Sequence, residues 1–228
     1  MLSAIINLFF PKVCYACNGL LHDHESYICT TCRHDLPVTN FHFNDDLTVS
    51  KTFYGRAVIE QATALLRFTK KGITQKLIHN LKYKNHEEIG VFLGDWLGSE
   101  LKTIESYKNI DIVIPVPLHK KKLKKRGYNQ VAKFAQQIAK ALDAEYTSSV
   151  LIKVTNTASQ VHKNRFSRSR LLNTHEIFVV KNNSEIEGKH ILLVDDIITT
   201  GATLEACINV LSNANNVKIS IATMAIAQ

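Results

Sequence analysis

Ile191-Leu-Leu-Val-Asp-Asp-Ile-Ile-Thr-Thr-Gly-Ala-Thr203 carries the strongest structural signal in this 228-residue chain. Its apolar, β-branched beginning is typical of a strand buried in a parallel sheet, and we expect the strand to end where Asp195 and Asp196 reach the surface. The turn that follows opens a helix, whose free N–H groups and positive dipole end favour a bound anion. Gly201 allows close backbone approach, and the threonine hydroxyls add hydrogen-bond donors.

Carboxylates beside an anion-binding turn suit a sugar phosphate. We therefore expect Asp195 and Asp196 to bind ribose hydroxyls and to be the catalytic pair of any reaction at this site. The 5′-phosphate is expected on the turn residues Thr199, Thr200, Gly201, Ala202 and Thr203.

The same stretch resembles the phosphoribosyl pyrophosphate motif of type I phosphoribosyltransferases, an apolar strand followed by an acidic pair and T-x-G-x-T. The resemblance implies a parallel-sheet α/β domain that binds phosphoribosyl pyrophosphate with Mg²⁺, a cation that reduces repulsion between carboxylates and phosphates. One alternative is a solvated strand end followed by an ordinary capped helix. Another is a receiver domain, but its phosphoryl-accepting aspartate lies mid-chain, whereas this acidic pair lies near the carboxyl end.

The composition allows one sizeable α/β domain with a small appendage. The formal net charge of +8 permits phosphate-rich partners, including nucleic acid, without establishing them. Residues 1–10 are apolar but lack the basic start and cleavage site of a secretory signal, and they are too few to span a bilayer. We expect a short amphipathic helix there, no transmembrane segment, and a cytoplasmic location. Peripheral contact with the inner face of the membrane is an alternative.

Two C-x-x-C pairs near the start predict a metal site. Cys14 and Cys17 form the first pair, and Cys29 and Cys32 form the second after eleven intervening residues. In a reducing compartment, four such thiolates suit one closed, tetrahedral, structural Zn²⁺ site. A redox C-x-x-C motif is the alternative, although its duplication around so short a loop argues against it. The isolated Cys207 is expected to be a core residue.

Apolar periodicity predicts the remaining elements and their order. From about residue 50, strands alternate with helices, which is typical of a parallel α/β sheet. We predict a zinc module over residues 1–40, a polar, irregular linker over 36–50, and a phosphoribosyltransferase-like domain over 51–228. Strands are predicted at 53–59, 62–69, 110–117, 177–180, 191–194 and 218–226, and helices at 73–83, 89–101, about 130–142 and 204–211.

A strongly basic segment, residues 120–126, follows the strand that ends at Pro117. We expect a loop there, because Pro115 and Pro117 cannot donate ladder hydrogen bonds and stop the strand. Ligands of open α/β sheets bind beyond strand carboxyl ends, so this loop is placed to hold pyrophosphate or a nucleic-acid backbone. A merely solvated loop is the alternative. The residues predicted to contact phosphate here are Lys124, Lys125, Arg126 and Gly127.

Three further stretches sharpen the resemblance. Ile114-Pro-Val-Pro-Leu-His119, Lys124-Lys-Arg-Gly-Tyr-Asn-Gln130 and Leu81-Lys-Tyr-Lys84, together with the cysteine pairs and the acidic motif, resemble the ComF family. The resemblance implies a zinc module joined to a type I phosphoribosyltransferase-like domain, acting in natural transformation on incoming single-stranded DNA in the cytoplasm. It also assigns Gln160 and Arg165 to a segment that closes over pyrophosphate or nucleic-acid phosphate. A helicase or other DNA-uptake machinery would be the partner.

Three functions therefore stay open at the level of sequence. The favoured hypothesis is a DNA-handling protein with a phosphoribosyl-pyrophosphate-type site. A second is a working, amidophosphoribosyltransferase-like enzyme acting on a small acceptor, in which positioning and electrostatics would carry the chemistry. A third is a zinc-scaffolded adaptor with a vestigial nucleotide site. No residue stands out as a base that activates a nucleophile, and the sequence identifies no acceptor.

Overall fold

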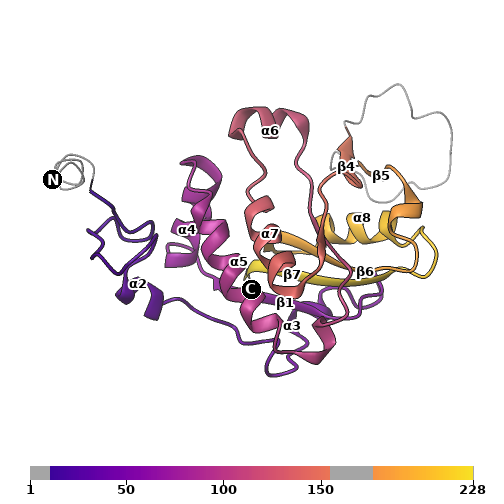
Figure 1. The fold of residues 1–228 in the computed structure, drawn as a ribbon, viewed down its shortest axis with the longest axis horizontal. Helices are drawn as coiled ribbons and strands as arrows, with labels where there is room; N and C mark the ends of the chain where they lie inside the picture. Colours follow the sequence, from indigo (N-terminus) through magenta and orange to yellow (C-terminus); the bar gives the residue numbers. More distant parts are fainter. Residues whose placement is uncertain (1–10, 155–176, 228) are drawn as a thin grey trace.

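A parallel sheet forms the centre of the computed structural model, which describes residues 11–154 and 177–227 (Figure 1). Within these residues the sheet has five strands, and every neighbouring pair is parallel. Their spatial order is β1 (Ala62–Phe68), β7 (Lys218–Ala227), β6 (His190–Ile198), β2 (Ile112–Pro115) and β3 (Glu145–Tyr146). The predicted parallel α/β architecture is confirmed, and the apolar run before the acidic pair lies in the central strand β6.

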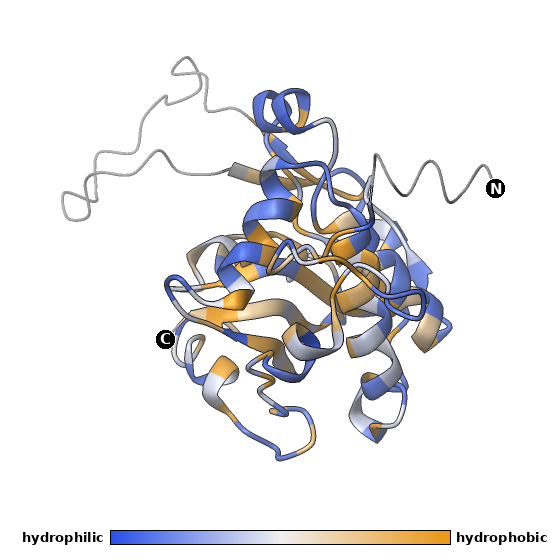
Figure 2. Cartoon of the chain, turned by 90° about the vertical axis from the view of Figure 1, so that its left-hand side faces the viewer, coloured by the Kyte–Doolittle hydropathy of each residue, from blue (hydrophilic) through white to orange (hydrophobic). Residues whose placement is uncertain are grey.

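Helices cover both faces of this sheet. On one face, apolar side chains of α4 (Ile73–Tyr83), α5 (Glu88–Leu101) and α7 (Ala132–Leu142) pack in one cluster with β6. On the other face, α3 (Thr48–Lys51) and α8 (Ala202–Leu211) contribute to a second cluster. Figure 2 shows hydrophobic strands inside and more hydrophilic surfaces outside. This arrangement explains the helical periodicity that the sequence shows over α4, α5 and α7.

The basic segment forms a helix, so the predicted loop is wrong. α6 (Lys120–Arg126) begins after His119, whose Nδ1 accepts a hydrogen bond from the Lys121 N–H at 3.2 Å. Lysine, arginine and leucine all favour helices, and Gly127 ends α6 in the left-handed conformation. The helix lies at the top of Figure 1. The cysteine region, which contains Cys14, Cys17, Cys29 and Cys32, lies on one side of it, and β4 (Leu151–Val154) and β5 (Ile177–Val180) lie on the other.

The central strand β6 also differs from its predicted extent. It continues through both aspartates to Ile198, because β7 keeps pairing with it as far as Ile226. Asp196 is only 5% exposed and does not reach the surface as predicted. The β-branched Ile197 and Ile198 favour this continuation.

The segment predicted as a polar linker instead packs on the sheet. Val38 forms an isolated bridge with Leu66 of β1, while Phe41 and Val49 are buried in the second cluster. The strand predicted over 53–59 is also wrong, because this stretch forms turns in which Arg56 and Ala57 donate hydrogen bonds back to the Phe53 carbonyl. The segment thereby lies against the turn after β6, where Thr52 and Phe53 are close to Gly201.

A small antiparallel pair lies beside the main sheet. β4 (Leu151–Val154) pairs with β5 (Ile177–Val180), which confirms the strand predicted at 177–180. The described residues also form two short 3₁₀ helices, η1 (Glu105–Tyr107) and η3 (Asn183–Glu185). The predicted site residues Gln160 and Arg165, and the apolar stretch 1–10, lie outside the described residues. In the described part of the chain, no helix has both the length and the apolar character needed to cross a membrane.

The cysteine region packs against α4 and α5. Ala16 and Ile28 belong to the same apolar cluster as Leu81 and Leu93. The Asn80 side chain of α4 donates a hydrogen bond to the Tyr15 carbonyl at 2.6 Å. The region includes α2 (Thr30–His34). Its contacts place the cysteine cluster on the face of the sheet that α4, α5 and α7 cover.

Candidate functional site

The turn between β6 and α8 forms a small hollow of about 40 Å³. Gly201 is the N-cap of α8 and has φ +74°, a conformation that glycine adopts without the steric cost of a side chain. Asp195 lines the same hollow, which brings the first predicted carboxylate to the predicted phosphate turn. The turn residues that line it are Thr199, Thr200, Gly201, Ala202 and Thr203.

Arg56 braces this turn from outside the motif. Its guanidinium donates a hydrogen bond to the Thr200 carbonyl at 2.9 Å and another to the Thr52 carbonyl at 3.1 Å. It also forms an ion pair with Glu205 on the first turn of α8. Arg56 was not predicted as a site residue, and no local pattern points to it, because its partners lie as many as 149 positions away.

The two aspartates occupy different environments because successive strand side chains point to opposite faces. Asp195 lies on the α8 face, and its Oδ1 accepts a hydrogen bond from the Asp196 N–H at 2.8 Å. Burial, first, and the negative charge of Asp196 raise the pKa of Asp195 to about 8, against the opposing effects of that hydrogen bond and of Lys82 and Lys153.

Asp196 lies on the opposite face and is held by two side chains. Lys82 of α4 donates to its Oδ1 at 2.8 Å, and Gln130 donates to its Oδ2 at 2.7 Å. Neither Lys82 nor Gln130 was predicted as a site residue. The useful signals were the L-K-Y segment that contains Lys82 and the R-G-Y-N-Q segment that contains Gln130. The acidic pair is thus one carboxylate facing the turn and one carboxylate anchored inside the fold.

A larger cavity of about 380 Å³ lies between α4 and α6. Arg126 connects it to the acidic pair, because its guanidinium donates to Gln130 Oε1 at 2.8 Å. Of the four residues of this segment predicted to contact phosphate, Lys125 and Arg126 line this cavity, whereas Lys124 and Gly127 do not. The lining residues are Lys82, Tyr83, Asn85, Lys122, Lys125, Arg126 and Tyr128.

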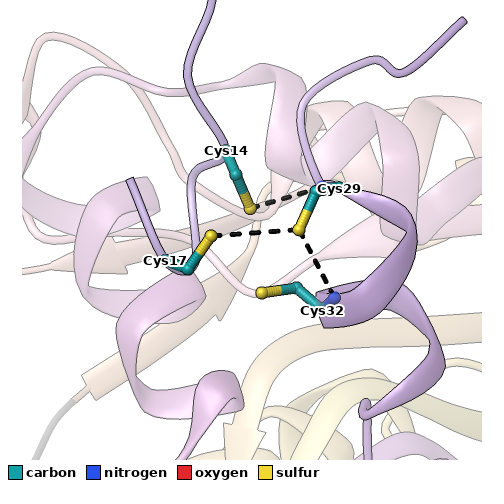
Figure 3. Close-up of side chains that lie close together, drawn as sticks. All are labelled: Cys14, Cys17, Cys29 and Cys32. Carbon is teal, nitrogen blue, oxygen red and sulfur yellow. Dashed lines mark hydrogen bonds between the residues drawn. The ribbon is translucent and has the colours of Figure 1, made fainter. Parts of the chain in front are cut away.

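The four predicted metal ligands converge, as Figure 3 shows. All four sulfur atoms lie within 4.8 Å of one another, and Cys17 Sγ is 3.8 Å from Cys29 Sγ. Zinc–sulfur bonds of about 2.3 Å in a tetrahedron would separate the sulfur atoms by roughly 3.8 Å, so the cluster has the size that one zinc ion needs. Cys14, Cys17, Cys29 and Cys32 are all free thiols in this structure.

Backbone N–H groups point at these sulfur atoms. Ala16 and Cys29 donate to Cys14 Sγ at 3.4 and 3.3 Å, and Gly19 donates to Cys17 Sγ at 3.4 Å. Burial raises the pKa of the Cys14 thiol, but the N–H donors outweigh it and lower the value to about 7. Donors of this kind stabilise thiolates and fix ligand orientation, which suits a structural metal site.

Comparison with known proteins identifies the family. A model of the phosphoribosyl transferase domain matches residues 131–227, which include the acidic pair and the turn. Competence protein ComFC of Bacillus subtilis is 30% identical over 194 residues, which are 85% of this chain and 75% of that protein. The chain belongs to the ComF family.

Two other proteins resemble this ComF-family chain. Competence protein F of Haemophilus influenzae is 27% identical over 208 residues, covering 86% of this chain and 89% of that protein. DNA utilization protein YhgH of Salmonella typhi is 29% identical over 131 residues, covering 56% of each. In this ComF-family chain, the cysteine cluster and α6 precede the matched phosphoribosyl transferase domain.

Proposed function

We propose that this ComF-family protein acts in natural transformation by handling incoming single-stranded DNA in the cytoplasm, and that it retains a binding site for phosphoribosyl pyrophosphate with Mg²⁺. The observation that carries the proposal is the convergence of Asp195 with the turn Thr199–Thr203 in one hollow. A separate cavity lined by basic side chains is linked to the acidic pair through the Lys82–Asp196 contact. A related metabolic enzyme would need the hollow but not the α6 cations. The names of the relatives, which refer to competence and DNA utilization, support the same role.

Within the proposed site, the turn holds the 5′-phosphate through the N–H groups at the start of α8. Asp195, at the side of the hollow, accepts hydrogen bonds from the ribose hydroxyls. Asp196 positions the strand end through Lys82 and Gln130, because both of its carboxylate oxygens already have partners inside the fold. Mg²⁺, when bound, would neutralise phosphate charge and favour the ionised form of Asp195. In the cysteine region, Zn²⁺ would be structural, since four thiolates leave no open position.

Genetics tests the proposed function directly. Deleting the gene in its source organism should reduce the number of transformants while uptake of labelled DNA across the cell surface continues. Re-supplying the native chain should restore transformation, and Asp195→Asn should restore it only in part. Normal transformation in the deletion strain would contradict the proposal.

A second candidate is a phosphoribosyltransferase acting on a small acceptor. The intact acidic motif within a matched phosphoribosyl transferase domain favours it. Release of pyrophosphate from phosphoribosyl pyrophosphate, stimulated by one of a panel of purine bases or by ammonia, would support this candidate. An Asp195→Asn protein should then lose that stimulation, because the chemistry depends on positioning the ribose.

A further inference from the structure

The cavity between α4 and α6 combines free positive charge with aromatic surface. Four of its lining side chains are cationic, and one of them, Lys82, is paired with Asp196. Over residues 11–154 and 177–227, neither Lys122 nor Lys125 forms an ion pair. Both therefore contribute uncompensated charge to the cavity, which favours an anionic ligand.

Tyr83 supplies an exposed ring at this cavity. Tyr83 is 61% exposed, although large aromatic side chains are usually buried to a greater extent. The Arg126 guanidinium lies 5.3 Å from its ring centroid, and His79 lies 5.0 Å away in a tilted contact. Tyr128, which is half-buried, is fixed by a hydrogen bond to the Leu81 carbonyl. An aromatic ring held beside a guanidinium is a surface on which a nucleobase can stack.

We propose that this cavity binds one nucleotide unit of a single-stranded nucleic acid, with its phosphate on Lys122 and Lys125 and its base against Tyr83. The inference rests on the proposed DNA-handling function and assigns that function to particular residues. A pyrophosphate group would use the lysines but not the tyrosine rings, whereas a nucleotide uses both. A paired base in a duplex would not present its face to Tyr83, so the arrangement selects an unpaired strand. The volume of about 380 Å³ falls within the usual range for small-ligand sites.

The test measures binding of a fluorescein-labelled oligothymidine 20-mer to full-length, zinc-loaded protein by fluorescence anisotropy at several salt concentrations. Tyr83→Ala should weaken binding about 5- to 160-fold, whereas Tyr83→Phe should bind like the native chain. Phe43→Ala is the matched control, because Phe43 is another exposed aromatic residue and lies outside this cavity. It should leave affinity unchanged.

The lysines have a separate signature in the salt dependence. Lys122→Ala/Lys125→Ala should reduce the slope of log affinity against log salt by about 1.4, the value for two phosphate contacts to a single strand. Lys102→Ala/Lys140→Ala removes the same charge from exposed positions elsewhere and should leave the slope nearly unchanged. Tyr83→Ala should lower affinity without altering the slope, because stacking releases no counterions.

Two results overturn the inference, and they differ from failure of the proposed function. Native affinity and slope in both the Tyr83→Ala and the double-lysine variants would place DNA elsewhere on the protein. Displacement of the 20-mer by thymidine 5′-monophosphate at equal nucleotide concentration would show that the cavity takes free nucleotides rather than a strand. No binding of the 20-mer by the native chain would instead contradict the DNA-handling function itself. Titration with phosphoribosyl pyrophosphate and Mg²⁺ should be unaffected by Tyr83→Ala.

Discussion

Replacing Gly201 by alanine should disrupt the turn at the centre of the proposed site. The residue has φ +74°, where an L side chain is strained, and an added Cβ would lie 2.8 Å from Thr52 Cγ2 and 3.1 Å from Phe53 Cε1. Phe53 is fully buried, so its ring cannot simply rotate into solvent. Either the turn or the segment beneath it must move.

The expected cost has two parts. The left-handed conformation costs a non-glycine residue about 1–2 kcal/mol, and overpacking a filled site costs about 1–3 kcal/mol more. Gly201→Ala should therefore reduce the free energy of unfolding by about 2–5 kcal/mol. Gly188→Ala is the matched control, because Gly188 has φ +68° but nothing within 4 Å of an added Cβ. It should cost only the conformational part.

Thermal unfolding followed by circular dichroism measures the difference. For a chain of this size, the packing part corresponds to a melting temperature roughly 2–12 °C lower in Gly201→Ala than in Gly188→Ala. Because the turn must shift, Gly201→Ala should also weaken binding of phosphoribosyl pyrophosphate, whereas Gly188→Ala should not. Equal melting temperatures for the two variants would refute the claim that the turn is packed tightly against Thr52 and Phe53.

Three further predictions follow from the site. Burial and the charge of Asp196 raise the pKa of Asp195 to about 8. At pH 7, binding of a ligand that needs the carboxylate should therefore release a proton, and affinity should rise with pH between 6 and 8 by at most about tenfold per unit. Calorimetry in two buffers of different ionisation enthalpy measures this release, and its persistence in Asp195→Asn would contradict the assignment. Lys82→Met leaves Asp196 buried without its cation and should reduce the free energy of unfolding, measured by urea titration, by about 3–5 kcal/mol. Lys76→Met, on the exposed side of α4, should change it by less than about 0.5 kcal/mol. Equal effects of the two substitutions would show that the ion pair does not matter. Metal analysis should find one zinc ion per chain. Cys17→Ser should lose the zinc and unfold the cysteine region, since structural zinc binding contributes about 10–16 kcal/mol to folding, whereas Cys207→Ala should retain the zinc. A zinc-free native protein would refute the metal site.

Local sequence patterns predicted the elements whose burial follows a simple period. The helix predicted over 73–83 coincides with α4, and the apolar run before Asp195 is the buried core of β6. Such segments are predictable because one periodic stripe or run determines what they bury. The cysteine spacing likewise predicted a cluster that the fold brings together.

The failures come from interactions between distant residues or from competing local signals. The charge of residues 120–126 suggested a loop, although their helix propensities and the His119 and Gly127 caps favour α6. Burial of Phe41 and Phe53 depends on contacts with the sheet that no local pattern records. The link between Lys82 and Asp196 joins residues 114 positions apart.

The different orientations of Asp195 and Asp196 were only partly predictable from the sequence. Adjacent residues of a strand face opposite sides, so the two carboxylates could not both face the turn after β6 once the strand continued through them. What the sequence could not supply was that continuation, which depends on pairing with β7. The structure thus places Asp195 beside the turn and anchors Asp196 inside the fold.

The most direct test of the central claim is calorimetric titration of phosphoribosyl pyrophosphate with Mg²⁺ into folded, zinc-loaded protein. We predict saturable, Mg²⁺-dependent binding to the native chain and a loss of at least tenfold in affinity in Asp195→Asn. Asp95→Asn makes the same change on the exposed surface of α5 and should bind with native affinity. Absence of binding to the native chain, or equal affinity in Asp195→Asn, would contradict the assignment of this hollow as a phosphoribosyl pyrophosphate site.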